Sequence, residues 1–309
     1  MAERGRQRAI LIAGPTASGK TAAALDLART LGGLIVNADA MQVYAELEIL
    51  TARPGPEEQR LAPHRLFGHV PAAQAYSAGR WLEHARQALA EAWGQGRVAI
   101  VVGGTGLYFR SLDEGLADIP EVAPELRATW RRALAERGAG ALHEELAARA
   151  PDEARRLRPS DGQRIARALE VLEATGAPLS AYHAQGPGPS PLAGADVIRV
   201  AIVPDRALLY RRCDERLVKM MEEGALEEVA RLVALDLDPA LPAMRAIGVA
   251  ALARHLAGDL TLDEAIAIAQ RETRNYAKRQ LTWLRHQMLA YEPVSDATAA
   301  VARCVESGT

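Results

Sequence analysis

The chain has 309 residues, 49% of them hydrophobic, and a formal net charge of −2. This composition supports a large buried core in one or two domains and excludes a protein covered in positive charge, so any nucleic-acid surface must be local. Cys213 and Cys304 are far apart and lack the spacing of metal ligands. No apolar run approaches the roughly 20 residues that span a membrane. We therefore expect a cytoplasmic protein with two reduced thiols and no membrane association.

The first element is an apolar strand over residues 9–13, and it leads into a glycine-rich loop and then an Ala- and Leu-rich helix that ends at Leu31. This strand–loop–helix order, with the pattern Gly-x-x-x-x-Gly-Lys-Thr, predicts a phosphate-binding loop rather than an ordinary turn. Its glycines permit close backbone approach, its N–H groups converge on an anion at the helix start, and its Thr hydroxyl is placed to ligate Mg²⁺. The loop consists of Gly14, Pro15, Thr16, Ala17, Ser18, Gly19, Lys20 and Thr21.

Asp39 follows a second short buried strand, expected over residues 34–36. Ligands in open parallel sheets bind at the carboxyl ends of the strands, so Asp39 is expected near the phosphate loop. There a carboxylate suits water-mediated Mg²⁺ binding or general-base chemistry. The alternative is a helix N-cap, for which Asp is also favoured, and the residues alone leave both interpretations open.

A third strand over residues 98–102 follows a helix expected over residues 80–93. Its continuous apolar character is typical of a parallel sheet that is buried on both faces. It opens into Gly103-Gly104-Thr105-Gly106, where the glycines allow close backbone approach and Thr105 supplies a hydroxyl. A tight strand-to-helix turn is the alternative. As the second glycine-rich strand end of one sheet, this segment is expected to line the same cleft.

Beyond residue 120 the pattern is helical, with helices expected over residues 125–137, 141–150 and 162–175. A Gly- and Pro-rich segment over residues 185–194 precedes another strand over residues 197–203. We predict an α/β fold in which a P-loop NTPase-like parallel sheet core carries an inserted all-helical domain and a helical C-terminal region. The core comprises residues 1–118 and 196–309, and the insertion residues 119–195. The C-terminal helices are expected over residues 206–222, 225–235, 245–257 and 262–288.

Positive charge is concentrated in two segments, residues 155–167 and 271–286, each with five Lys or Arg against one acidic residue. In the second segment four of these fall at helical spacing and form one basic stripe: Arg271, Arg274, Lys278 and Arg285. A solvated helix face usually explains a single basic run. Two runs together with a phosphate loop favour a polyanionic partner.

Taken together, these segments resemble the tRNA dimethylallyltransferases, also called tRNA isopentenyltransferases. The similarity covers residues 9–286 and its motifs occur in the same order as in that family. The matching segments are the phosphate loop, residues 39–44, Thr51-Ala52-Arg53-Pro54, Pro63-His64-Arg65-Leu66, residues 103–108, Arg245-Ala246-Ile247-Gly248 and residues 273–285.

The resemblance implies a transfer of the dimethylallyl group of dimethylallyl diphosphate to N6 of adenosine 37, beside the anticodon of tRNA. The phosphate loop would hold the diphosphate with Mg²⁺ on Thr21, and Lys20 would stabilise the leaving group. Asp39 would be the general base, and Thr105 would orient the amine or the bridging oxygen. Arg216, or alternatively Arg212, would also bind the diphosphate.

The resemblance further implies that the inserted helices clamp the anticodon stem–loop of tRNA and that the long terminal helix lies against its phosphates. No heptad or exposed repeat in the sequence suggests a partner helix, so we expect a monomer. Ala40 and Val249 replace the Ser and Tyr usual in the family, and Arg53 replaces Lys. These departures affect the details of RNA contact more than the reaction. The implied tRNA contacts are Asp39, Ala40, Met41, Gln42, Thr105, Arg127, Gln163, Arg164, Ile165, Ala166, Arg167, Arg245, Ala246, Ile247, Gly248, Val249, Ala250, Arg274 and Lys278.

Three other functions remain open on the residues. A P-loop kinase of a small molecule would use ATP in the loop and Asp39 as base, but it leaves the C-terminal basic helix unexplained. A prenyltransferase that acts on free adenine nucleotides needs no RNA clamp. A nucleotide-gated RNA-binding switch leaves Asp39 and Thr105 without roles.

Overall fold

A computed structural model of the chain describes residues 7–307 and contains one parallel β-sheet of six strands. The α/β architecture and the strands expected over residues 9–13, 34–36, 98–102 and 197–203 are confirmed. The two edge strands were missed, because they have only two and three residues and no apolar run. The strand order is β3 (His64–Arg65), β2 (Leu34–Asn37), β4 (Ala99–Gly103), β1 (Arg8–Ala13), β5 (Asp196–Ile202) and β6 (Glu292–Val294).

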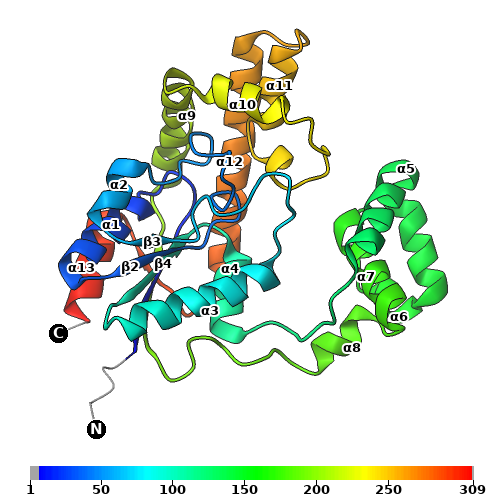
Figure 1. Cartoon of the computed structure of the whole chain (residues 1–309), viewed down its shortest axis with the longest axis horizontal. Helices are drawn as coiled ribbons and strands as arrows, with labels where there is room; N and C mark the ends of the chain where they lie inside the picture. The colour runs from blue at the N-terminus through cyan, green and yellow to red at the C-terminus, as the bar shows by residue number, and fades with distance from the viewer. Residues whose placement is uncertain (1–6, 308–309) are drawn as a thin grey trace. The chain divides into compact units, whose positions relative to one another are not determined.

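Helices cover both faces of the sheet, as Figure 1 shows for α1 and α13 on one side and α3 and α4 on the other. Alternate strand residues such as Ile10, Ile100 and Ile202 point to the first face and form one apolar cluster with α1 and α13. On the other face the Trp81 indole of α3 donates a hydrogen bond to the Asn37 carbonyl oxygen, 2.8 Å away. The helices of this core are α1 (Lys20–Leu31), α2 (Pro56–Leu61), α3 (Ala78–Gly94), α4 (Gly106–Glu114) and α13 (Ala297–Glu306).

A second group of helices follows β5, and Figure 1 shows them on the side of the core toward which α12 extends. The long helix begins at a capping box, in which the Thr261 side chain accepts from the Glu264 N–H and the Glu264 carboxylate accepts from the Thr261 N–H. Three of the four helices lie where they were predicted. The group consists of α9 (Arg206–Glu222), α10 (Ala225–Val233), α11 (Val249–Leu256) and α12 (Leu262–Gln287).

Two predictions for the C-terminal region are wrong. The helix expected from residue 245 begins only at Val249, because Gly248 has φ +92° and interrupts the chain after the short 3₁₀ turn η1 (Ala243–Arg245). The region after residue 288 is not helical throughout, since it adds β6 to the sheet before α13 begins.

The chain divides into two compact units, one of Met1–Asp113 with Pro191–Thr309 and one of Glu114–Ser190, which we call the helical unit. The helical unit has its own apolar core, built around Trp130, Leu142, Leu146 and Leu169. Its helices are α5 (Pro124–Arg149), which Gly138 interrupts with φ +79°, α6 (Pro151–Arg155), α7 (Gly162–Thr175) and α8 (Leu179–Ala184).

The expectation that residues 119–195 form a tRNA-binding domain stays a proposal, and the ends of the expected core, residues 1–6 and 308–309, lie outside the described residues. Cys213 and Cys304 are both buried free thiols. Over residues 7–307 the structure has no helix that is long and apolar enough to cross a membrane.

Candidate active site

The phosphate loop joins β1 to α1 in a strained, compact turn. Gly19 has φ +91° and Ala17 has φ +61°, so both adopt the left-handed conformation. A Cβ on Gly14 would lie 2.7 Å from the Ser18 hydroxyl oxygen, which explains the glycine at that position. The Lys20 ammonium folds back to donate to the Pro15 carbonyl oxygen at 3.2 Å. Burial lowers the pKa of Lys20 to about 8, and Asp39 offsets part of that effect.

Two cavities flank this loop. The loop cavity, of about 550 Å³, lies between the phosphate loop, α9 and the start of α13. It brings the cationic side chains of Arg212 and Arg216 to the same space as Lys20 and the Thr21 hydroxyl. The residues that line it are Ala17, Ser18, Gly19, Lys20, Thr21, Arg212, Arg216, Asp296, Ala297 and Thr298.

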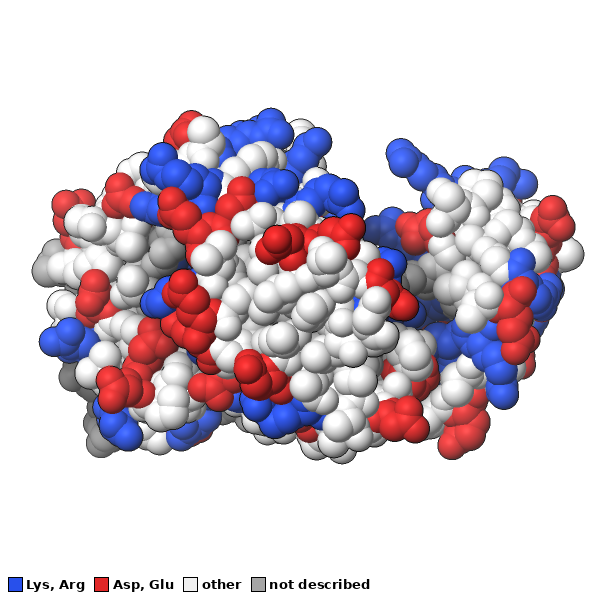
Figure 2. All heavy atoms as spheres, turned by 90° about the horizontal axis from the view of Figure 1, so that it is seen from above, with Lys and Arg blue, Asp and Glu red and all other residues white. Residues whose placement is uncertain are grey.

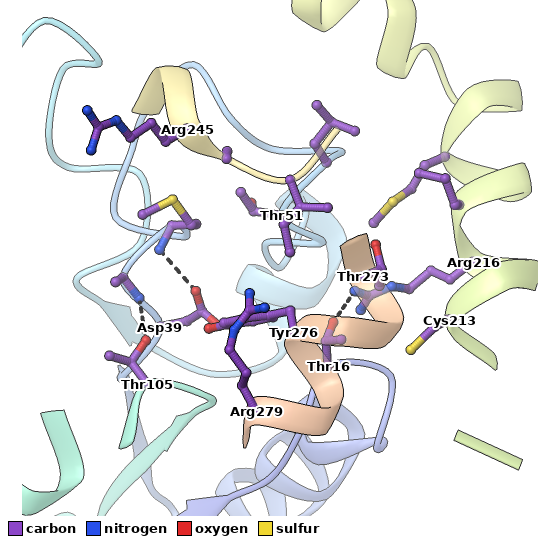
Figure 3. A pocket seen from close by; sticks show the side chains of 17 residues that line it. Thr16, Asp39, Thr51, Thr105, Cys213, Arg216, Arg245, Thr273, Tyr276 and Arg279 are labelled. Atoms are coloured by element: carbon purple, nitrogen blue, oxygen red, sulfur yellow. Dashed lines mark hydrogen bonds between the residues drawn. The ribbon is translucent and has the colours of Figure 1, made fainter. Parts of the chain in front are cut away.

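The central cavity, of about 320 Å³, lies on the other side of Thr16 and Arg216, and Figure 3 shows its walls. The proposed base Asp39 and the proposed orienting residue Thr105 both line it. Its remaining lining residues are Thr16, Ala40, Met41, Leu50, Thr51, Cys213, Arg216, Leu217, Met220, Arg245, Ala246, Ile247, Thr273, Tyr276 and Arg279.

Asp39 lies in a rigid turn at the end of β2. Its backbone N–H donates to the Asn37 side-chain oxygen at 2.8 Å, and one of its own carboxylate oxygens accepts from the Met41 N–H at 3.0 Å. No helix starts here, since the chain from residue 38 to residue 55 forms turns and extended segments. The helix-capping interpretation is therefore wrong. Asp39 lines the central cavity, so its carboxylate is placed to meet a ligand there.

Thr105 connects the second glycine-rich turn to Asp39. Its hydroxyl oxygen accepts from the Ala40 N–H at 2.9 Å, a bond drawn in Figure 3. The glycines around it make close contacts with protein. A Cβ on Gly103 would lie 2.1 Å from the Ala38 carbonyl oxygen, and a Cβ on Gly106 would lie 2.1 Å from the Trp283 ring. These glycines allow the turn to pack closely against Ala38 and Trp283. Within the segment 103–106, only Thr105 lines the central cavity.

Thr16 links the phosphate loop to α9 and α12. The Arg216 guanidinium donates to the Thr16 hydroxyl, and the Thr16 N–H donates to the Gln280 side-chain oxygen at 2.9 Å. Burial lowers the pKa of Arg216. Because Arg216 lines both cavities and Arg212 only the loop cavity, the geometry favours Arg216 as the main arginine for a diphosphate that spans the two.

Several residues of α12 that were not predicted from the sequence also face the site: Thr273, Tyr276 and Arg279 line the central cavity. In Figure 3 Tyr276 lies beside Asp39, and the pKa of Tyr276 is raised by burial first and by the Asp39 charge second. Arg279 is placed over the Tyr276 ring, 5.5 Å from its centroid. The spacing of Thr273, Tyr276 and Gln280 places them on a second face of the helix, distinct from the basic stripe, and this spacing is the sequence signal that points to them.

The proposed tRNA contacts in the core differ in their surroundings. Those that line the central cavity are Asp39, Ala40, Met41, Thr105, Arg245, Ala246 and Ile247. Gln42 is buried and donates to the Thr51 and Ala52 carbonyl oxygens, and Gly248 and Val249 are also buried, so none of the three residues faces solvent. Ala250 and Lys278 are exposed, whereas Arg274 forms an ion pair with Asp214.

In the helical unit Gln163 and Arg164 are exposed and Arg167 is partly exposed, whereas Ile165 and Ala166 belong to the apolar core. Arg127 is half-buried, and its buried Nε has no hydrogen-bond partner among residues 7–307. Arg164 pairs with Asp161 at 3.5 Å and Arg167 with Glu170 at 3.1 Å. Accordingly, Figure 2 shows basic and acidic side chains interspersed on the helical unit rather than a continuous basic face in this view.

The residues around the phosphate loop fit Mg²⁺ held mainly by a substrate. Within residues 7–307 no three His, Cys, Asp or Glu side chains group in a way that would hold a metal. Mg²⁺ keeps several waters and is often bound through one or two protein ligands and substrate phosphates. The Thr21 hydroxyl, which opens onto the loop cavity, suits such a site.

A parallel sheet with a phosphate loop at its carboxyl edge, beside an Asp-lined cavity, defines an enzyme of the P-loop class. Family profiles described as IPP transferase and Isopentenyl transferase match residues 42–287 and 7–67. The chain belongs to the IPP transferase family, which confirms the resemblance found in the sequence.

Relatives and solved structures agree with this assignment. A tRNA dimethylallyltransferase from Rhodopseudomonas palustris is 54% identical over 92% of this chain and 88% of its own length. One from Methylobacterium sp. is 56% identical over 91% of each chain. The full-length tRNA isopentenylpyrophosphate transferase from Bacillus halodurans superposes with a TM-score of 0.69 at 29% identity, covering 98% of this chain and 96% of that one. A eukaryotic dimethylallyltransferase solved while acting on tRNA gives a TM-score of 0.82 at 26% identity, and the match covers 97% of this chain and 78% of that one.

Proposed function

We propose that this chain transfers the dimethylallyl group of dimethylallyl diphosphate to N6 of adenosine 37 in tRNA, giving N6-(dimethylallyl)adenosine and diphosphate. The observation that carries the proposal is that Asp39, Thr105 and Arg216 line one cavity directly beside the phosphate loop. An amine that must lose a proton and a diphosphate that gains negative charge then have complementary partners in the same space. The family relationship supports the same reaction.

The donor side of the reaction follows from the phosphate loop. The bond between the dimethylallyl C1 and the bridging oxygen breaks, and its electron pair stays with the diphosphate. Lys20, Arg216 and the N-terminus of α1 lie where this charge develops, and fixed charges and N–H groups stabilise it without reorganisation. When bound at Thr21, Mg²⁺ supplies further positive charge to the leaving group.

The acceptor side follows from Asp39 and Thr105. The adenosine must leave its base stack to enter the central cavity, as in other base-modifying enzymes. Its N6 is a poor nucleophile because the lone pair is delocalised into the ring, so the new N6–C1 bond needs a base to take the departing proton. The Asp39 carboxylate accepts that proton, and Thr105 orients the amine or the bridging oxygen.

The function is tested by incubating the protein with radiolabelled dimethylallyl diphosphate, Mg²⁺ and an anticodon stem–loop. Parallel reactions contain AMP as acceptor, or ATP with no prenyl donor. We expect label on the stem–loop adenosine alone. Label on AMP alone would assign the chain to free nucleotides, and ATP turnover without any transfer would assign it to the kinases.

The base is tested by Asp39→Asn, which keeps the oxygen that accepts from the Met41 N–H but cannot take a proton at neutral pH. We expect the rate of transfer to fall about 10²- to 10⁴-fold, the usual contribution of a positioned base. Binding of inorganic pyrophosphate should persist. Asp26→Asn, an exposed position on α1, is the matched control and should keep its activity. A similar rate in both variants would show that Asp39 is not the base.

A further inference from the structure

We infer that Gln280 is a positioning residue that fixes the distance between the two glycine-rich turns, and thereby between the donor and the acceptor. The inference rests on the proposed function. Gln280 comes from α12, and its side chain is only 6% exposed. It lies between the two turns, and its side chain also interacts with Tyr276, which lines the central cavity.

The Gln280 amide joins segments that are far apart in the chain. Its oxygen accepts from the Thr16 N–H of the phosphate loop at 2.9 Å, and its nitrogen donates to the Gly104 carbonyl oxygen, also at 2.9 Å. A primary amide is suited to this bridge, because it offers an acceptor and a donor in one rigid plane. Both backbone groups are thereby satisfied by a single side chain.

The close fit of this bridge is visible at Gly104. A Cβ on Gly104 would lie 2.1 Å from the Gln280 nitrogen and 3.2 Å from the Gly14 carbonyl oxygen. Only a glycine leaves room for the amide between the two turns. The second glycine-rich turn is therefore shaped to receive a side chain of α12.

Each turn carries one half of the proposed reaction. Thr16 binds the Arg216 guanidinium on the diphosphate side. Thr105, next to Gly104, holds the Ala40 N–H beside Asp39 on the amine side. Transfer requires N6 and C1 to approach within about 3–3.5 Å, and a misplacement of about 1 Å costs up to about 100-fold in rate. The amide bridge controls this separation without touching either substrate.

The inference predicts a loss in kcat with little loss in binding when the bridge is removed. In Gln280→Met the side chain keeps its length but makes neither hydrogen bond. We expect kcat for transfer to the stem–loop to fall about 10- to 100-fold. The KM values of both substrates and the Kd of inorganic pyrophosphate should change by less than about threefold, since each turn keeps the groups that bind its own substrate and only the separation of the turns changes.

Two further variants separate positioning from packing. Gln270→Met makes the same change on the same helix, where the Gln270 nitrogen donates to the Asp214 carbonyl oxygen at 3.3 Å; it should transfer at the wild-type rate. Gln280→Asn keeps a buried amide that is one methylene too short to reach both turns, and it should show the same loss in kcat. If thermal unfolding shows that Gln280→Met is not folded, Gln280→Asn takes its place as the test of the inference.

Four outcomes would overturn the inference: an unchanged kcat in Gln280→Met, a wild-type kcat in Gln280→Asn, a loss in Gln270→Met as large as in Gln280→Met, or a loss of pyrophosphate affinity as large as the loss in kcat. Failure of the wild-type protein to transfer label would instead overturn the proposed function, so the two failures are distinct.

Discussion

Lys20 combines a binding role with an unusual charge state. Its ammonium is buried under the phosphate loop, and this burial lowers its pKa to about 8 from the ordinary value of 10.5. The ligand-free protein therefore loses this positive charge as the pH rises through 8, and a bound diphosphate favours the charged form. We expect the affinity for inorganic pyrophosphate to gain less from Lys20 at pH 9 than at pH 7, and binding at pH 8.5 to be accompanied by uptake of a proton.

Isothermal titration calorimetry in two buffers of different ionisation enthalpy measures that proton uptake. Lys20→Arg is the control, because a guanidinium stays charged across this range. Its binding should show no uptake attributable to residue 20. If the variant takes up as many protons as the wild type, the titrating group is elsewhere. The same lowered pKa affects the free energy of unfolding. The ligand-free fold gains stability as the pH rises from about 8 toward 10.5, because burial disfavours the charged form of Lys20 in the folded state.

At the scale of elements, α10 holds the loop that forms one wall of the central cavity. The Glu228 side chain is 3% exposed, and its carboxylate accepts the backbone N–H groups of Glu48, Ile49 and Leu50 at 2.8, 2.8 and 3.0 Å. Leu50 and Thr51 of this loop line the cavity. A buried carboxylate thus anchors a segment that has no regular secondary structure of its own.

Glu228→Gln should loosen this wall. The amide places an NH₂ group where three N–H donors converge, so at least one buried donor loses its acceptor, at a cost of about 1–3 kcal/mol in the free energy of unfolding. Chemical denaturation measures that loss. We also expect the KM of the stem–loop to rise. Glu227→Gln changes the neighbouring exposed carboxylate of α10 and should leave both quantities unchanged; an equal effect there would contradict the anchoring role.

The elements that were predicted correctly share a strong local signal. The central strands are continuous apolar runs, and α7 and α9 end where the sequence pattern ends. The failures have tertiary causes. The edge strands β3 and β6 are fixed by pairing with β2 and β5, and the late start of α11 depends on Gly248, which has φ +92° and packs closely against Leu50.

The residues of the site also differ in whether a local sequence signal identifies them. The phosphate loop, Asp39 and Thr105 can be predicted from the sequence, because each lies at the end of a strand, where the topology of a parallel sheet places ligands. Gln280 and Tyr276 have no such signal, since their importance arises from long-range contacts between α12 and the two turns. The resemblance to a family pointed to the segment that contains them without giving either residue a role.

At the scale of the whole molecule, the two units divide the proposed work. All the residues that line both cavities belong to the sheet-containing unit, whereas the helical unit has a separate core and contributes exposed polar side chains on α7. The proposed monomer, which sedimentation at micromolar concentration tests, would then use the helical unit only to hold RNA, while the sheet-containing unit receives the target adenosine and performs the chemistry. Substitutions in the helical unit should consequently change the affinity for RNA and leave the affinity for diphosphate unchanged.

Replacing Arg164 and Arg167 together by Ala tests this division. The exposed Arg164–Asp161 pair contributes little to stability. Arg167 pairs with the largely buried Glu170, so its loss costs some stability, and thermal unfolding checks that the variant is folded at the assay temperature. We expect weaker binding of the stem–loop, with the slope of log K against log salt reduced by about 1 for each RNA phosphate that an arginine no longer neutralises. The Kd of inorganic pyrophosphate should not change. Arg132→Ala, an exposed arginine on α5, is the control. If it weakens RNA binding as much as the double variant, the effect is one of overall charge, and α7 has no specific part in holding tRNA.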